Sequence, residues 1–185
     1  MGDIKHITTP LTEEMARSLK AGDIVSITGI IYTGRDAAHK RLVEALDRGE
    51  ELPVDLRNQI IYYVGPTPAK PGQAIGSAGP TTSGRMDAYS PRLLDYGLRG
   101  MIGKGYRSAE VVEAMKRNGG VYFAATGGAA ALIAKSIKKY EVVAYPDLLS
   151  EAIAELTVEN FPAIVVIDSE GRNFYEEGQK QYRTL

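Results

Sequence analysis

Short apolar segments alternate with amphipathic segments along the second half of the chain, and this alternation limits the possible folds more than any other feature. The apolar segments have the length and the flanking turn residues of β-strands, and the amphipathic segments have the periodicity of helices with one buried face. The predicted strands are 98–102, 121–125, 141–145 and 162–167, and the predicted helices are 108–117, 127–137 and 147–154. The pattern predicts a layered α/β domain, but it does not give the order of the strands.

The first half of the chain adds an arm and fewer regular segments. With 185 residues, 44% of them hydrophobic, the chain suits one domain, predicted over 23–185 and preceded by an arm over 1–22. In the arm, Thr12 is predicted to cap a short helix that ends at Gly22. The other predicted elements are strands at 23–28 and 60–64 and helices at 87–96 and at 36–48, the last with Asp36 as its N-cap.

The composition excludes several classes of function. The 22 Lys and Arg against 23 Asp and Glu give a net charge of −1, so the composition does not predict binding to nucleic acid or to an anionic membrane. Neither a membrane-spanning run of ~18 apolar residues nor a signal-peptide pattern occurs, and we expect a cytoplasmic protein. The chain has no cysteine, which excludes disulfides, thiol nucleophiles and any iron–sulfur cluster held by its own thiolates.

Three cations stand beside glycines at the ends of predicted strands or just before predicted helices. They are Arg35 after Gly34, Arg85 at the end of the run of Gly, Thr and Ser over 76–87, and Lys104 between two glycines. Helix N-termini and the carboxyl ends of strands favour anions, and arginine can hold a carboxylate with two hydrogen bonds. Together these cations predict a site for a small polyanionic acid. The plain alternative for each is a turn cation in water.

Other candidate chemistry is weaker. His39 faces inward on the apolar stripe of the predicted helix over 36–48, where a satisfied, partly buried histidine is a sufficient interpretation. In the run over 125–131, Thr126 is predicted as a helix N-cap, and the glycines and alanines favour close helix packing. That run lacks the Lys and Ser/Thr of a phosphate-binding loop. His6 and His39 are the only histidines, and their spacing suggests neither a triad nor a metal site.

Four motifs together resemble the β-subunit of iron–sulfur (class I) fumarases, a family that also includes the β-subunit of L-tartrate dehydratase. The motifs are Thr33-Gly34-Arg35-Asp36-Ala37-Ala38-His39-Lys40, Gly79-Pro80-Thr81-Thr82-Ser83-Gly84-Arg85-Met86-Asp87, Lys104-Gly105 and Ala125-Thr126-Gly127-Gly128-Ala129-Ala130. The likeness covers about 22–168, and the run over 79–87 is its most specific part. It implies a swivelling β/β/α domain with a mixed sheet.

The resemblance also implies a reaction and a division of labour. The implied enzyme is a hydro-lyase that hydrates fumarate to malate, with a [4Fe–4S] cluster held by three cysteines of an α-subunit and the fourth iron position open for substrate. Because this chain has no cysteine, a Cys-bearing α-subunit must be its partner, and an α2β2 assembly is plausible.

By the same resemblance, Arg35, Arg85 and Lys104 match residues that bind the carboxylates of a C4 dicarboxylate. Thr81 matches a residue proposed to act in acid–base chemistry, although a threonine hydroxyl needs nearby cations to lower its pKa. His39 and Asp36 are expected only to orient the site.

Three alternatives remain open at this stage. The nearest is the β-subunit of L-tartrate dehydratase, because no residue can be tied to the extra hydroxyl of tartrate. A phosphohistidine swivelling carrier domain would use His39, but it would leave the loop over 79–87 without a role. A non-catalytic anion-binding module would bind its ligand without any α-subunit.

Overall fold

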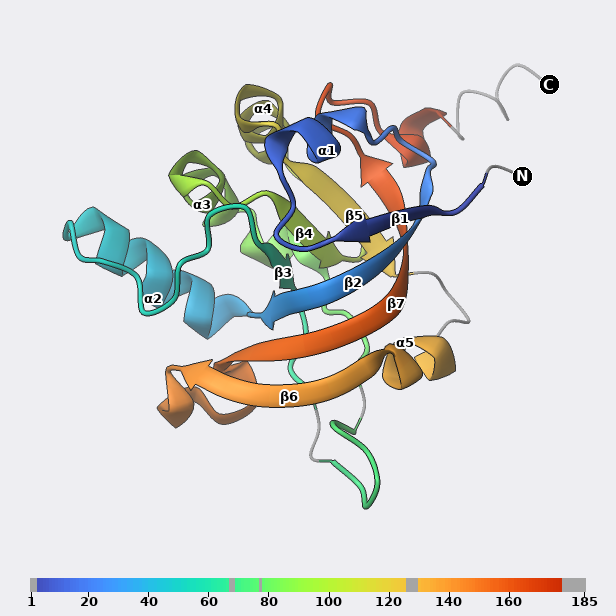
Figure 1. The fold of residues 1–185 in the computed structure, drawn as a ribbon. Helices are drawn as coiled ribbons and strands as arrows, with labels where there is room; N and C mark the ends of the chain where they lie inside the picture. The colour runs from blue at the N-terminus through green and yellow to red at the C-terminus, as the bar shows by residue number, and fades with distance from the viewer. Residues whose placement is uncertain (1–2, 67–68, 77, 126–129, 178–185) are drawn as a thin grey trace.

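Five strands of a mixed sheet close into a barrel in the computed structural model, which describes residues 3–66, 69–76, 78–125 and 130–177 (Figure 1). The parallel strands are β2 (Ile24–Thr33), β3 (Ile60–Tyr62), β4 (Gly100–Gly103) and β5 (Val121–Ala125). β7 (Ile153–Ile167) runs antiparallel to both β5 and β2 and completes the ring. The predicted α/β class and mixed sheet are confirmed, whereas closure of the sheet was not predicted.

The length of β7 makes the closure possible. It pairs with β2 from Ile24↔Ile164 to Tyr32↔Glu155 and with β5 from Tyr122↔Ile167 to Ala125↔Ala163. The first half of β7 also pairs with β6 (Ile137–Ala144). Thus β7 starts well before the predicted strand at 162–167, and β6 starts before the one at 141–145.

The predicted helix over 147–154 is wrong. A short 3-10 segment, η2 (Pro146–Glu151), takes its place, and Ile153 already belongs to β7. Leu149, inside the predicted range, has a φ angle of 56°, which an α-helix cannot contain. Of the predicted helix over 127–137, the structure shows α5 (Ala130–Ser136), and Thr126 with its predicted cap lies outside the described residues.

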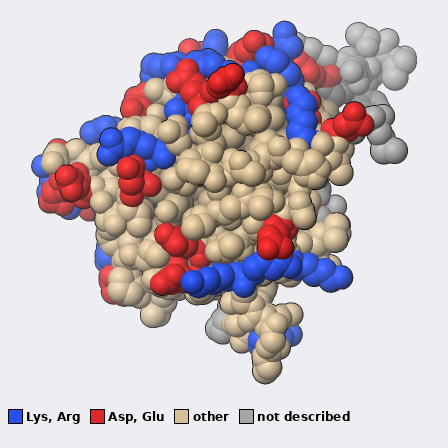
Figure 2. Space-filling view, viewed as in Figure 1, with Lys and Arg blue, Asp and Glu red and all other residues tan. Residues whose placement is uncertain are grey.

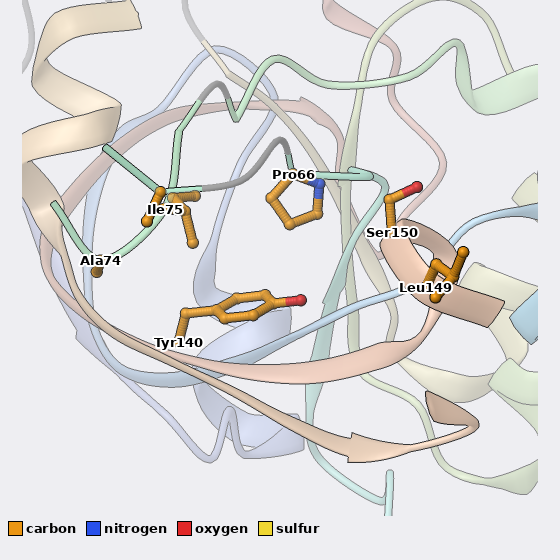
Figure 3. Close-up of a pocket in the computed structure, with 7 residues that line it drawn as sticks. Pro66, Ala74, Ile75, Tyr140, Leu149 and Ser150 are labelled. Carbon is orange, nitrogen blue, oxygen red and sulfur yellow. The ribbon is translucent and has the colours of Figure 1, made fainter. Parts of the chain in front are cut away.

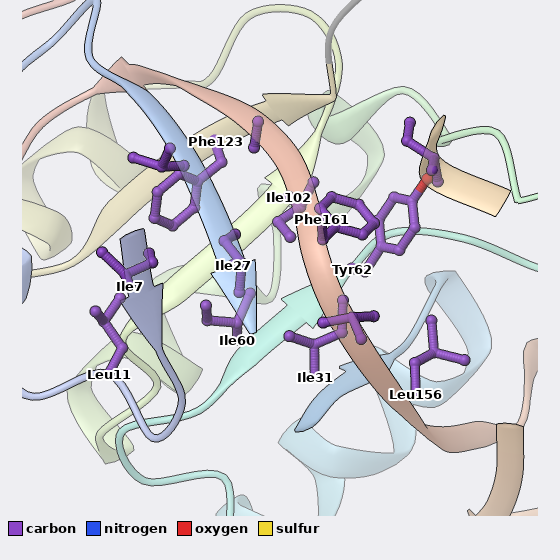
Figure 4. Packing of buried hydrophobic residues seen from close by; sticks show 14 of the residues in the cluster. Ile7, Leu11, Ile27, Ile31, Ile60, Tyr62, Ile102, Phe123, Leu156 and Phe161 are labelled. Atoms are coloured by element: carbon purple, nitrogen blue, oxygen red, sulfur yellow. The ribbon is translucent and has the colours of Figure 1, made fainter. Parts of the chain in front are cut away.

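Side chains of the barrel strands alternate between two cores. Ile60, Ile102 and Phe123 point inward and pack with side chains of β2 and β7, and the ring of Phe161 meets Tyr62 edge-on at 5.3 Å (Figure 4). Their neighbours on the same strands point outward and join the second core. This alternation is the period of a strand with both faces buried.

Three helices cover the outward faces of β3, β4 and β5 (Figure 1). They are α2 (Asp36–Asp47), α3 (Ser90–Tyr96) and α4 (Ala109–Asn118). The N-cap of α2 is Arg35 and not Asp36 as predicted. The helix predicted over 87–96 begins only at Ser90, after a separate 3-10 turn, η1 (Ser83–Met86).

The N-terminal segment contributes β1 (Lys5–Thr8), which pairs in parallel with β2, and α1 (Glu13–Ser18). The strand was not predicted, because four residues with one buried side chain give no periodicity. The predicted cap is confirmed, since the Met15 amide donates to Thr12 Oγ1 at 3.1 Å. The helix ends at Ser18 and not at Gly22.

The face formed by β2, β7 and β6 carries no helix over its centre (Figure 1). Charged side chains gather along the upper and lower borders of this view, and most of the middle is uncharged (Figure 2). Ile24, Ile30 and Val142 are among its exposed side chains. Among the helices of the described residues, none is both long and apolar enough to cross a membrane.

Candidate anion-binding site

The carboxyl ends of β2, β3 and β4 meet at one edge of the barrel, and the predicted site residues follow those ends. The Gly34 amide after β2 donates to the Tyr62 carbonyl at 3.1 Å, and the Thr81 amide donates to the Tyr63 carbonyl at 2.7 Å. Thr82 forms an isolated parallel bridge with Lys104, and the Ser83 amide donates to the Lys104 carbonyl at 2.8 Å. Backbone hydrogen bonds therefore join four segments that are distant in sequence: the turn after β2, the end of β3, residues 81–83 and Lys104.

Arg35 occupies the turn between β2 and α2 and is partly buried. Its Nε is buried without a hydrogen-bond partner among the described residues, and no described carboxylate pairs with its guanidinium. Gly65 lies directly against it, because a Cβ at Gly65 would come within 3.1 Å of Arg35 Cδ and Nη1. A partly buried arginine with an unpartnered Nε at a helix N-terminus is suited to an anion.

Arg85 lies in η1 and pairs with Asp36, the first residue of α2. Arg85 Nη2 is 2.7 Å from Asp36 Oδ2, with side-chain exposures of 57% and 31%. The other oxygen, Asp36 Oδ1, is buried and has no partner among the described residues. The ion pair links the loop that carries Arg85 to the turn that carries Arg35.

Lys104 and Thr81 are the other two predicted residues of the anion site. Lys104 is exposed directly after β4 and forms no ion pair with a described residue, and Thr81 is half-buried. Two carboxylates stand beside these three cations: Asp36, and Glu151, whose Oε1 accepts from the Ala37 amide at 3.5 Å at the start of α2. The remaining local charge is +1 in a chain of net charge −1, which favours a small anion.

His39 lies beneath the site and not in it. Its side chain is fully buried, Nδ1 is 2.8 Å from the Arg35 carbonyl, and the Tyr63 ring packs against it edge-on at 5.3 Å. Burial lowers the pKa of His39 to about 4, so the ring is neutral at pH 7 and Nδ1 donates to that carbonyl. His39 Nε2 finds no hydrogen-bond partner among the described residues.

Sequence reasoning missed a buried polar network behind the exposed cations. Arg107 Nε donates to Asp87 Oδ1 at 2.7 Å, and Arg107 Nη2 donates to Ser90 Oγ at 2.9 Å and to the Tyr63 hydroxyl at 3.1 Å. The Ser108 amide donates to the other Asp87 oxygen at 2.7 Å. Asp87 is the last residue of the motif over 79–87 and Arg107 lies three residues after Lys104, but nothing in their spacing signals burial.

An apolar pocket of about 410 Å³ lies near the turn of Arg35, because Ser150, which lines it, and Arg35 both lie against Gly65. Tyr140 of β6 lies across it, with Pro66 and Ile75 on one side and Leu149 and Ser150 on the other (Figure 3). The Ser150 carbonyl is also 3.3 Å from the Cβ position at Gly65. None of the described residues that line this pocket is a cation, so these residues do not extend the anion site. Most of the run over 125–131, the fourth motif, lies outside the described residues.

The residues present do not fit an iron–sulfur cluster. The chain has no cysteine, and the described residues contain no group of three or more His, Asp or Glu that could hold a metal ion. An iron–sulfur cluster is held mainly by thiolates, and the site offers cations and hydroxyls in their place.

The fold and the site thus define an α/β barrel domain with a cluster of cations at one edge. The chain belongs to the family described as "Fumarase C-terminus", which matches residues 3–178. The resemblance predicted from the motifs is confirmed.

Relatives of two lengths match the chain. It is 46% identical over 157 residues to "Fumarate hydratase class I, aerobic" of Salmonella typhimurium, covering 84% of this chain and 27% of that protein. It is 42% identical over 182 residues to "Putative fumarate hydratase class I" of Geobacillus stearothermophilus, covering 94% of this chain and 34% of that protein. It is also 42% identical over 184 residues to "Putative L(+)-tartrate dehydratase subunit beta" of Methanocaldococcus jannaschii, covering 96% of this chain and 94% of that protein. The chain therefore spans about a third or less of these fumarate hydratases and nearly all of a beta subunit.

Proposed function

We propose that this chain is the β-subunit of a hydro-lyase that acts on a C4 dicarboxylate. The observation that carries the proposal is that Arg35, Arg85 and Lys104 lie in loops that backbone hydrogen bonds and the Arg85–Asp36 ion pair join at one edge of the barrel. Fixed cations in a partly buried site stabilise the carboxylates of the substrate and the charge that develops on one of them during addition of water.

Each residue has a proposed role. Arg35 and Lys104 bind substrate carboxylates directly, because neither is paired with a described carboxylate. Arg85 binds a carboxylate and is oriented by Asp36. Thr81 is the proposed acid–base residue at the substrate carbon, and the nearby cations favour its ionised form. His39 orients the turn through its bond to the Arg35 carbonyl.

The partner is part of the proposal. A relative of nearly equal length is named as a beta subunit, and the relatives named as fumarate hydratases are about three or more times longer than the matched region. We propose that a Cys-bearing α-subunit supplies the [4Fe–4S] cluster that this chain cannot hold, in an α2β2 assembly. A swivelling movement of this domain relative to that partner is likewise a proposal.

Fumarate is the proposed substrate, and L-tartrate is the second candidate, which the beta-subunit relative favours by its printed name. The discriminating experiment is anaerobic co-expression with a Cys-bearing α-subunit, followed by rates on malate and on L-tartrate. We expect the complex to be active and the isolated chain to be colourless and inactive. Iron–sulfur absorbance from the isolated chain would contradict the division of labour.

Two other classes of function are less well supported. A phosphohistidine carrier needs an accessible ring nitrogen, but His39 is fully buried and its Nδ1 is hydrogen-bonded. A stand-alone anion-binding module would bind malate without a partner. Calorimetry of the isolated chain with malate tests that reading, and tight binding there would favour it.

A further inference from the structure

Arg107 has a fully buried side chain, although it lies only three residues after the exposed Lys104. Its guanidinium reaches three different segments. It pairs with Asp87 after η1, donates to Ser90 at the start of α3, and donates to the Tyr63 hydroxyl just after β3. One side chain therefore connects the loop after β4 to the end of β3 and to the segment between η1 and α3.

Two aromatic rings fix the plane of the guanidinium. Arg107 Cζ lies 4.8 Å from the centre of the Tyr122 ring and 5.3 Å from that of Tyr63. The Tyr122 hydroxyl is 2.7 Å from Ser83 Oγ, and Ser83 is the first residue of η1. The same cluster thus holds both ends of the segment that carries Arg85.

The position of the Arg107–Asp87 ion pair says more about its role than any contribution of the pair to the stability of the fold. A buried ion pair is weak evidence for stability, because desolvation offsets much of the attraction, and apolar residues of similar volume often replace such pairs without loss. Asp87 lies two residues after Arg85, and Arg107 lies three residues after Lys104. The pair therefore joins, on the buried side, the two loops whose exposed sides carry the cations.

We propose that Arg107 is a positioning residue of the dicarboxylate site. It holds the segment over 81–87 against the loop over 104–108, so that Thr81, Arg85 and Lys104 face one ligand. This inference rests on the proposed function. The planar fork of arginine serves Asp87, Ser90 and Tyr63 at once, whereas a lysine ammonium in the same place cannot keep all three hydrogen bonds and both ring contacts.

The test compares Arg107→Lys with a matched control, Arg99→Lys. Arg99 precedes the opposite end of β4, has 11% side-chain exposure, and donates to Asn58 Oδ1 at 2.8 Å and to the Asn118 carbonyl. Both variants keep the positive charge but replace the planar guanidinium with an ammonium group. With the full chain in complex with the α-subunit, Arg107→Lys should lower kcat/KM for the C4 dicarboxylate by about tenfold or more. Arg99→Lys should keep it within about twofold.

Hydrogen–deuterium exchange of the full chain supplies a readout independent of activity. Amides over 81–87 should exchange faster in Arg107→Lys than in the wild type and should not change in Arg99→Lys. Equal exchange over 81–87 in Arg107→Lys and the wild type would overturn the proposal. A loss of kcat/KM no greater than that of Arg99→Lys would overturn it too.

If the wild-type complex acts on neither malate nor L-tartrate, the proposed function fails. The exchange comparison then still decides whether Arg107 positions the segment.

Discussion

Arg85 and Asp36 form an ion pair of 2.7 Å, although one belongs to the 3-10 turn η1 and the other begins helix α2. The pair brings two glycine-framed motifs, 49 residues apart in sequence, to the same edge of the barrel. Because Asp36 follows Arg35 directly, the pair also sets the distance between two of the three proposed carboxylate-binding cations.

Asp36→Asn tests the orienting role of this pair. The pair is exposed enough that its loss should lower the free energy of unfolding by less than about 1 kcal/mol. KM for the dicarboxylate should nevertheless rise by about tenfold, because Arg85 is no longer held toward the site. Steady-state kinetics of the complex and urea unfolding of the chain measure the two effects. A lower KM in the variant would mean instead that Asp36 competes with the substrate for Arg85.

Gly65→Ala tests the packing behind Arg35. The added methyl would lie 3.1 Å from Arg35 Cδ and Nη1 and 3.3 Å from the Ser150 carbonyl, so the guanidinium must shift by a few tenths of an ångström. We expect KM to rise by about three- to tenfold with a fall in unfolding free energy of about 1 kcal/mol or less. An unchanged KM together with a large loss of stability would show that Gly65 serves the fold and not the position of Arg35.

His39 gives the stability of the chain a specific pH dependence. Burial lowers its pKa to about 4 from an ordinary value near 6.5, so the unfolded chain binds the proton more readily than the folded chain. The stabilisation from neutral His39 is complete above pH 6.5 and is lost as the pH falls toward 4, by up to about 3 kcal/mol.

The check is urea unfolding at several pH values between 7.5 and 4 for the wild type, His39→Gln and His6→Gln. His39→Gln should lack this part of the pH dependence, and His6→Gln, an exposed position, should retain it. Parallel curves for the wild type and His39→Gln would contradict the buried, neutral histidine.

Phe161 lies inside the barrel, and we expect its truncation to lower the free energy of unfolding strongly. Its side chain is fully buried and meets Tyr62 edge-on with ring centres 5.3 Å apart. Phe161→Ala should lower the free energy of unfolding by about 3–5 kcal/mol, through lost burial and the cavity left behind. Phe174→Ala, at a ring that is 40% exposed, is the control and should lower it by about 1 kcal/mol or less. Equal losses in urea unfolding would refute the assignment of Phe161 to the core.

Much of the parallel half of the fold could be predicted from sequence, because each of its elements is locally marked. The strand over 121–125 was predicted with its observed bounds, and Ser108 caps α4 as its side-chain type suggests. The closure by β7 could not be predicted, because a strand of 15 residues is defined by its pairing with β2, β5 and β6 and not by a local pattern.

In the site, too, local sequence marks some residues, and only tertiary packing reveals the others. Arg35, Arg85 and Lys104 stand beside glycines at strand ends or before helices, and their sequence context alone marks them as candidates. Arg107 and Asp87 have ordinary contexts, and only the packing of Tyr63 and Tyr122 around them shows that they are buried. Sequence patterns could therefore identify the exposed cations of the site but not the buried side chains behind them.

The most direct measurement of the central claim is kcat/KM for malate in the complex of this chain with the proposed α-subunit, with Arg85→Ala against Arg92→Ala. Arg92 is the matched control, an exposed arginine on α3 that pairs with Asp47 at 3.4 Å, away from the proposed site. We predict that Arg85→Ala lowers kcat/KM by about 10²- to 10³-fold, whereas Arg92→Ala changes it by less than about twofold. Full activity in Arg85→Ala would contradict the account.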